Sequence, residues 1–203
     1  MSAKLRPVSK PFYLGSIAVG MACGVALPFC GAGDPVGLLA SPARLLQAAP
    51  LLVILAYGQI VALVLLYRMW AAIQPASTTP GRAVGFLFVP LLNMYWAFRA
   101  FRGWAAEFGR LAQARGLSAP KPPDSAGLAI SVIVLLKLLL APLALAPGPA
   151  WLRDAGRWTL ALSMPVMTWA YLVFGLMFFS AGCTAINALS GQDEPSQPVD
   201  KPG

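Results

Sequence analysis

The amino-acid sequence predicts an all-α protein whose helices span a lipid bilayer. Of its 203 residues, 58% are hydrophobic and only 11% are charged, whereas soluble proteins carry roughly 25% charged residues. A chain of this size has a large surface relative to its volume, so a soluble fold would expose too much hydrocarbon to water. Several apolar runs are long enough to cross about 30 Å of hydrocarbon as helices, and none alternates in polarity as barrel strands do.

Four apolar runs predict the membrane-spanning helices, because backbone groups in lipid must be hydrogen-bonded within the segment. Basic residues before the first run also fit a secretory signal, but this run is longer than a signal core, and we expect it to remain as a span. The predicted spans are residues 12–30, 49–73, 126–147 and 158–186. They form one membrane domain over residues 1–189, followed by a polar tail at 190–203 that is expected to be disordered.

A fifth apolar run, residues 83–98, is shorter and contains Pro90 and Asn93. Proline interrupts helical hydrogen bonding, so this run either crosses the bilayer, which gives five spans, or enters it and returns. Cationic residues concentrate on the cytoplasmic side of membranes. With four spans, eleven of the fifteen Lys and Arg residues lie inside and three outside, and Lys137 lies within a span. We therefore predict four spans, a re-entrant segment and two cytoplasmic termini.

The stretch that follows has one apolar face and one basic face at helical spacing. The apolar face consists of Phe98, Phe101, Trp104, Ala105, Phe108, Leu111 and Ala112. Arg99, Arg102 and Arg110 lie on the opposite face and predict contacts with anionic lipid headgroups. The re-entrant segment and this amphipathic helix together cover residues 83–115. The apolar face fits the membrane interface and also packing on the protein's own helices, and both can hold for an interfacial amphipathic helix.

Lys137 is the most unusual residue, because it lies about ten residues from either end of its predicted span, where a lysine costs about 2.5–3.5 kcal/mol. No acidic residue falls within a predicted span. The functional interpretations are therefore an anionic ligand, a lipid headgroup or an acidic residue of another protein. The structural alternative is a side chain that reaches headgroups or backbone carbonyls freed by a bend. Gln59 and Asn93 are further amides within apolar runs, and such groups commonly bond between helices.

Ser16, Gly20 and Gly24 repeat every four residues in the first predicted span. Such a stripe of small residues lets another backbone approach closely. The partner backbone belongs either to the same chain or to a second subunit, which would make the protein a homo-oligomer.

Catalytic chemistry has little support in the sequence. Histidine is absent, the carboxylates lie outside the predicted spans without paired spacing, and the three cysteines do not have the spacing of a zinc or redox site. We predict no catalytic residue, no cofactor and no metal. The basic residues lie between apolar runs, so their expected partner is a lipid surface and not a nucleic acid.

Two neighbouring stretches form a motif: YRMW at 67–70 and TPGRAVGFLFVPLLNMYW at 79–96. They resemble a group of uncharacterised bacterial multi-span membrane proteins with the pattern PGxAVGFLFxPxxNxYW, followed by a basic stretch. The resemblance covers residues 67–115, about a quarter of the chain. It implies a bacterial inner membrane but no activity. In this motif Pro90 would break a helix, Asn93 would bond exposed backbone, and Tyr95 and Trp96 suit a membrane interface.

These observations predict a non-catalytic membrane protein that binds a partner protein or a lipid. The alternative is a small transporter or channel subunit, with Lys137, Gln59 and Asn93 as its polar lining. The partner, the transported substrate and the oligomeric state do not follow from the sequence.

Overall fold

The computed structural model of the protein describes residues 6–27, 41–117, 124–140 and 150–192. Every regular element within these residues is a helix, as the sequence predicts. The elements, in chain order, are α1 (Lys10–Ala26), α3 (Pro42–Ala72), α4 (Pro80–Gly85), the 3₁₀ helix η2 (Phe86–Phe88), α5 (Pro90–Ala114), α6 (Asp124–Leu140) and α7 (Ala150–Gln192).

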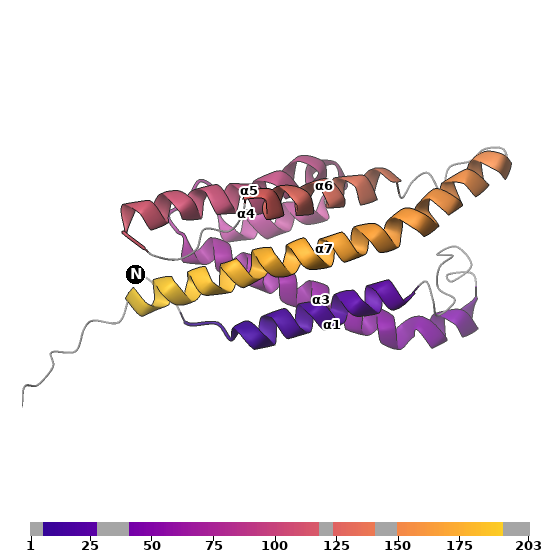
Figure 1. The fold of residues 1–203 in the computed structure, drawn as a ribbon, viewed down its shortest axis with the longest axis horizontal. Coiled ribbons are helices and arrows are strands. Elements are labelled where there is room, and N and C mark those ends of the chain that lie inside the picture. Colours follow the sequence, from indigo (N-terminus) through magenta and orange to yellow (C-terminus); the bar gives the residue numbers. More distant parts are fainter. Residues whose placement is uncertain (1–5, 28–40, 118–123, 141–149, 193–203) are drawn as a thin grey trace, which may run out of the picture.

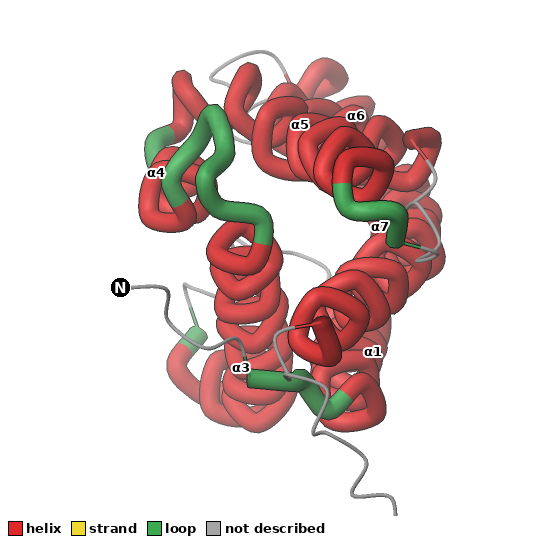
Figure 2. Tube along the Cα trace, turned by 90° about the vertical axis from the view of Figure 1, so that its left-hand side faces the viewer, coloured by secondary structure: helices red, strands yellow, loops and turns green. Residues whose placement is uncertain are grey.

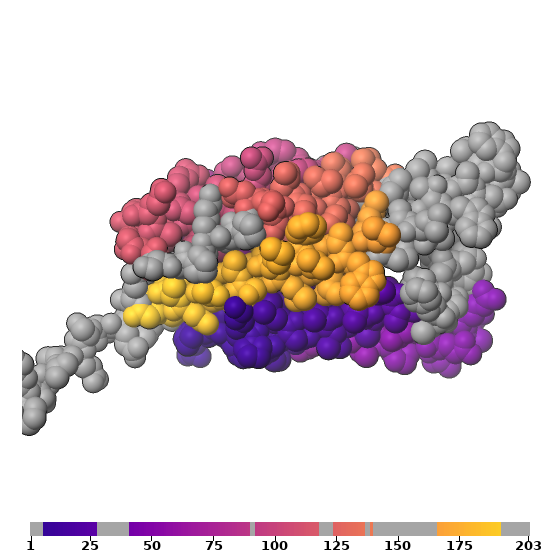
Figure 3. Space-filling view, in the orientation of Figure 1, coloured from indigo at the N-terminus to yellow at the C-terminus, as the bar shows by residue number. Residues whose placement is uncertain are grey.

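The helices form an elongated bundle in which α7 runs between two layers (Figure 1). α1 and α3 pack together on one side of α7, and α5 and α6 pack together on the other side (Figure 2). The space-filling view shows α7 in the seam between α1 and α6 (Figure 3). The short helix α4 lies beside the end of α3 and leads into α5.

The beginning of α1 and the ends of α3 and α7 meet at one end of the bundle. The backbone N–H of Val8 donates to Oδ1 of Asn187 at 2.7 Å, and the guanidinium of Arg68 donates to the Tyr13 hydroxyl at 3.1 Å. α5 also ends here (Figure 1). We call this the basic end because of the cations that its elements carry. Arg6 and Lys10 lie at the start of α1, Arg68 lies near the end of α3, and Arg82 lies in α4. Arg99, Arg102, Arg110 and Arg115 lie in the part of α5 that runs from the contact with Ser77 to the end of the helix. Arg44, at the start of α3, lies at the opposite end.

Two helices are long and apolar enough to cross a membrane: α3, and the Val166–Gly191 part of α7. α1 and α6 are apolar but shorter. The predicted spans at 12–30 and 126–147 extend into residues outside the described part of the chain. The described parts of all four predicted spans are therefore helical, and two of these helices are long and apolar enough to cross a membrane.

The boundaries of α3 and α7 differ most from the prediction. α3 begins at Pro42, seven residues before the predicted start, because proline is well suited to the first turn of a helix. α7 continues to Gln192, so the tail predicted to be disordered from residue 190 begins with three helical residues. The remainder of that tail lies outside the described residues.

Pro90 begins a helix instead of breaking one. Val89 has extended backbone angles, φ −95° and ψ 110°, and Pro90 follows as the first residue of α5. Proline is favoured there because its missing N–H would have no partner in the first turn. α5 then continues without interruption to Ala114. The predicted re-entrant segment and the predicted amphipathic helix are therefore largely one helix, and the break lies before it, in η2.

α4, η2 and α5 together form a hairpin. α4 starts at the basic end, where Thr79 Oγ1 accepts the backbone N–H of Arg82 at 3.4 Å and caps the helix. η2 carries the chain along the bundle, and α5 returns to the basic end (Figure 1). The chain therefore turns back within the segment that was expected to be broken, and the re-entry of this segment into a bilayer stays a prediction.

The apolar face of α5 packs on the protein's own helices, which is one of the two alternatives that the sequence left open. The location of this helix at a membrane interface stays a prediction. Trp104, Ala105 and Phe108 are fully buried. The ring of Trp104 lies 5.3 Å from that of Phe108 and 5.6 Å from that of Phe178 in α7. These aromatic side chains join α5 to the core instead of facing lipid headgroups.

The small-residue stripe of α1 packs against α3 of the same chain. A Cβ atom built on Gly20 would lie 2.6 Å from the Cα atom of Gly58, and one built on Gly58 would lie 3.1 Å from the carbonyl oxygen of Ser16. A Cβ atom built on Gly24 would lie 3.2 Å from Leu55. Of the two partners that the sequence left open, the structure gives the one within the chain.

We predict that Gly20→Ala lowers the free energy of unfolding by about 1–3 kcal/mol, although alanine is the better helix former, because the added methyl group meets backbone that cannot yield. The measurement is thermal unfolding in detergent. Gly15→Ala is the matched control in the same helix, since nothing lies within 4 Å of its Cβ position. Equal losses in the two variants would contradict the close contact between α1 and α3.

Candidate functional site

Two buried tryptophans fix α5 beside the end of α3. The indole N–H of Trp104 in α5 donates to the carbonyl oxygen of Met69 in α3 at 2.8 Å. In return, the indole N–H of Trp70 in α3 donates to the carbonyl oxygen of Ala100 in α5 at 3.1 Å. Both side chains are fully buried. This reciprocal pair fixes the position of α5 along the axis of α3, because a shift of either helix would leave two buried donors without acceptors.

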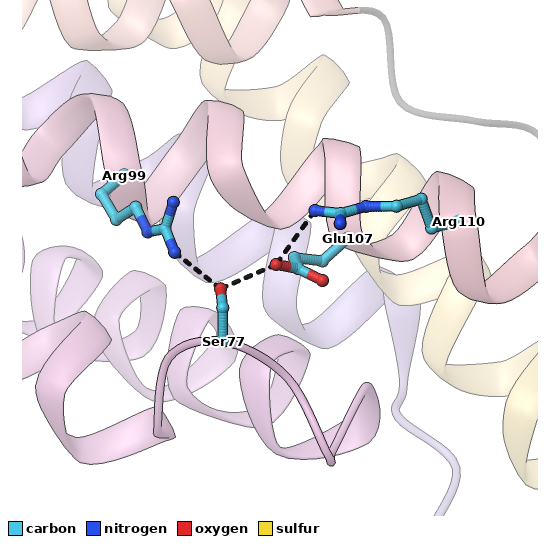
Figure 4. A network of polar contacts seen from close by, with 4 residues as sticks. All are labelled: Ser77, Arg99, Glu107 and Arg110. Atoms are coloured by element: carbon cyan, nitrogen blue, oxygen red, sulfur yellow. Dashed lines mark hydrogen bonds and ion pairs between the residues drawn. The ribbon is translucent and has the colours of Figure 1, made fainter.

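The loop between α3 and α4 is held to α5 by polar contacts (Figure 4). Arg99 donates from Nη2 to Ser77 Oγ at 2.7 Å, and Ser77 donates to Glu107 Oε1 at 2.7 Å. Arg110 forms an ion pair with the same carboxylate oxygen at 3.1 Å. Gln74 closes the loop by donating to the carbonyl oxygens of Trp70 and Thr78.

This polar network changes what the predicted lipid-contacting arginines can do. Arg99 is half-buried and bonded to the loop, and Arg110 is exposed but paired with Glu107. Arg102 is exposed. Arg99 therefore has a structural contact in addition to any contact with a headgroup.

α6 lies against α5 in the antiparallel direction. Ser131 Oγ bonds to the carbonyl oxygen of Ala97 at 3.1 Å and to that of Gly127 at 2.8 Å. One turn nearer the basic end, a Cβ atom on Gly127 would lie 3.2 Å from the backbone of Phe101 and Arg102. Two small residues on α6 thus allow its backbone to approach α5 closely.

The register of α5 and α6 places Asn93 and Lys137 at about one level. Asn93 precedes Ala97 by four residues, about 6 Å of helix axis. Lys137 follows Ser131 by six residues, about 9 Å, and in the same direction because the helices are antiparallel. The structure describes the backbone of Lys137 but not its side chain, so only the position of this residue along α6 enters the comparison.

Gln59 lies at a similar level in a different helix. Gln59 precedes Met69 in α3 by ten residues. Asn93 precedes Trp104 in α5, which bonds to Met69, by eleven residues. Both therefore lie about 15 Å along the helix axis from the tryptophan pair. Gln59 follows Gly58, which contacts α1. No hydrogen bond among the described residues joins Gln59 to Asn93. The structure therefore brings the predicted polar residues to one level without joining all of them in one site.

Two buried polar atoms near the turn of the hairpin have no partner among the described residues: Asn93 Oδ1 and Trp96 Nε1. One is a hydrogen-bond acceptor and the other a donor. The ring of Trp96 packs edge-on against Phe86 of η2, with centroids 4.7 Å apart, and Tyr95 beside it is 66% exposed. The side-chain oxygen of Asn93 therefore accepts no backbone N–H among the described residues, and a hydrogen bond from its amide nitrogen to exposed backbone stays a prediction.

The candidate site is therefore the α5 segment around Asn93 and Trp96, with the α6 segment around Lys137 next to it. Buried polar atoms are nearly always hydrogen-bonded in native proteins, so an unpaired donor and acceptor on adjacent turns indicate a group that the described residues do not supply. Within the described residues, no three His, Cys, Asp or Glu side chains are grouped so as to hold a metal ion.

Several structural residues carried signals that the sequence interpretation missed. Gly58 is the single glycine of α3, and Gly127 and Ser131 have the same spacing of four as the stripe in α1. Ser77 and Glu107 had no such signal, because they are thirty residues apart and meet only once the hairpin has formed.

Comparison with known proteins provides no relative: no protein-family model, curated protein or solved structure matches this chain. The resemblance of residues 67–115 to bacterial membrane proteins stays a prediction.

We predict that Asn93→Leu raises the thermal stability of the purified protein, since it removes an unpaired buried oxygen whose desolvation costs about 1–3 kcal/mol. Ser131→Ala is the control, because its hydroxyl is bonded and its removal should lower stability by about 1 kcal/mol. Both are measured by thermal unfolding in the same detergent. A loss of stability in Asn93→Leu comparable to that in Ser131→Ala would show that the amide is satisfied.

Proposed function

We propose that this chain is an integral membrane protein with four spans and a re-entrant hairpin. The outward faces of three helices support this proposal, because their exposed side chains are large, apolar and spaced by three or four residues. These side chains are Val53, Tyr57, Ile60, Val64 and Tyr67 in α3, Leu128, Val132, Leu136 and Leu139 in α6, and Val166, Trp169, Val173 and Met177 in α7. Apolar faces of this extent on several sides of one bundle suit lipid and not water.

The distribution of cations supports one orientation of the bundle. Eight Lys and Arg residues gather at the basic end, and cationic loops stay in the cytoplasm. In this orientation both termini are cytoplasmic and the hairpin enters the bilayer from the cytoplasmic side. With the resemblance of residues 67–115, the proposed location is a bacterial inner membrane, and exposed Arg102 and Arg110 face anionic headgroups.

Within the membrane, the proposed function is non-catalytic binding of a partner protein or a lipid. The observation that carries it is the unpaired pair of buried polar atoms, Asn93 Oδ1 and Trp96 Nε1. A chain that is selected only for stability would replace such atoms with apolar groups, because each lowers stability while unpaired. A bound group that completes these hydrogen bonds explains why they are kept.

A small transporter or channel subunit is the second candidate. The observation that favours it is the shared level of Gln59, Asn93 and Lys137, since a polar path through a bilayer needs polar side chains at its middle. Substrate-dependent flux in liposomes, lost in Lys137→Ala, would support this function over the first.

A photoreactive amino acid at position 93 tests the binding function in native membranes. We predict a crosslinked adduct of discrete mass, a protein or a lipid, because residue 93 lies beside the unpaired atoms. The same amino acid at Val173, on the outward face of α7, is the control and should give only a mixture of bulk lipids. Identical products from the two positions would contradict a specific partner at the hairpin.

A further inference from the structure

We propose that the start of α1 and the last turns of α3 and α7 form a binding site for one phosphate group at the basic end of the bundle. The site consists of Arg6, Lys10 and Arg68, and it is separate from the segment around Asn93 and Trp96. The phosphate belongs to a lipid headgroup or is a free anion, and the lipid source rests on the proposed membrane location.

Close contacts with α7 bring the other two helices together at this site. In α3, Met69 packs on Gly182 of α7, where a Cβ atom would lie 2.5 Å from the methionine sulfur. Ahead of α1, the backbone of Val8 exchanges two hydrogen bonds with the side chain of Asn187 in α7, at 2.7 Å and 3.1 Å. The start of α1 and the end of α3 are therefore fixed beside the same stretch of α7.

The guanidinium group of Arg68 is half-buried in this junction and is oriented by neutral acceptors. Its Nη1 atom donates to the Tyr13 hydroxyl at 3.1 Å, and its Nη2 atom donates to the carbonyl oxygen of Arg6 at 3.5 Å. Tyr13 is itself buried. A guanidinium has more N–H donors than these two contacts use, so Arg68 is held in place with donors left for a ligand.

Lys10 adds a second charge from α1, one helical turn before Tyr13. Its ammonium donates to Thr184 Oγ1 of α7 at 3.5 Å, and its side chain is exposed. Arg6 is also exposed, in the segment whose carbonyl oxygen accepts from Arg68. Cations from two helices and from the segment before α1 thus gather where three helices meet.

The described residues do not neutralise this cluster. Among them, no hydrogen bond or ion pair joins the three cations to a carboxylate, because the acceptors of Arg68 and Lys10 are hydroxyl and carbonyl oxygens. Glu107 belongs to the polar network of Figure 4, and Asp124 begins α6, which packs on α5 and α7. Neighbouring like charges repel each other, so an anion bound between them stabilises the junction.

A phosphate group suits both the donors and the surroundings of this cluster. Its several oxygens can accept from a guanidinium and an ammonium at the same time. Phe12 follows Lys10 by two residues and Tyr67 directly precedes Arg68, and these rings are 54% and 48% exposed. Aromatic side chains favour the membrane–water interface, which is the level of lipid phosphates. The cluster therefore has cations for a headgroup and apolar rings for the acyl chains beside it.

Thermal stabilisation of the full chain by ligand tests the site. The protein is delipidated in a neutral detergent and titrated with sodium phosphate or with phosphatidylglycerol. The references are sodium chloride at equal ionic strength and diacylglycerol, which lacks the phosphate. With at least one ligand we expect a saturable rise in melting temperature, of about 3–6 °C at about ten times the Kd. A rise with phosphatidylglycerol alone assigns a lipid phosphate, and a rise with sodium phosphate assigns a free anion.

Variants that each remove one positive charge separate this site from general attraction to the basic end. Lys10→Gln changes an exposed side chain and should weaken the ligand affinity by about tenfold or more, as should Arg68→Gln. Arg102→Gln removes an exposed cation at the same end but outside the site, so its affinity should stay within about twofold of the wild type. No saturable rise with either ligand, or equal affinities of Lys10→Gln and Arg102→Gln, would overturn the site and leave the membrane location intact.

The acidic tail of the same chain is the competing occupant. It contains Asp193, Glu194 and Asp200, which lie outside the described residues. A full-length variant with Asp193→Asn, Glu194→Gln and Asp200→Asn should keep the melting temperature of the wild type and show the same rise with ligand. A lower melting temperature in this variant, together with no rise in the wild type, would assign the tail to the cluster and overturn the proposal.

Discussion

The reciprocal hydrogen bonds of Trp70 and Trp104 are the constraint on which the rest of the structure depends. Each indole N–H is buried and reaches a backbone carbonyl of the other helix, so neither α3 nor α5 can slide without leaving a donor unpaired. Because this pair lies near the basic end, the length of α5 beyond it carries the turn of the hairpin to the middle of the bundle. The level of Asn93 and Trp96 follows from that position. The Ser77 network then ties the connecting loop to the same helix.

Packing in the bundle combines two kinds of contact. Glycine and serine let backbones approach closely, at Gly20 against Gly58 and at Gly127 against α5. Aromatic side chains fill the wider space between α5 and α7, where Trp104 meets Phe178. The close contacts bring α6 against α5 at Gly127 and Ser131.

Much of the fold could be predicted from the sequence, because long apolar runs can only be helices in lipid and because small-residue spacing reveals close packing. The prediction that Pro90 breaks a helix was wrong, because proline is compatible both with the end of a helix and with the first turn of the next one. The extended backbone of Val89 shows that Pro90 begins a helix here. The face of Phe101, Trp104 and Phe108 could not be assigned either, because hydrophobic periodicity does not distinguish lipid from a neighbouring helix. The unpaired atoms of Asn93 and Trp96 depend on every nearby side chain and are invisible in the sequence.

The central claim is that the hairpin enters the bilayer at the basic end and returns to the same side. Single cysteines at Gly81 and Ala114, both exposed, test it in a chain whose native cysteines are replaced by alanine, with a cysteine at Arg44 as the reference for the opposite side. A membrane-impermeant maleimide is applied to inside-out and to right-side-out vesicles. The account predicts that positions 81 and 114 react in inside-out vesicles and position 44 in right-side-out vesicles. Reaction of positions 81 and 114 from opposite sides would show that this segment crosses the membrane and would contradict the account.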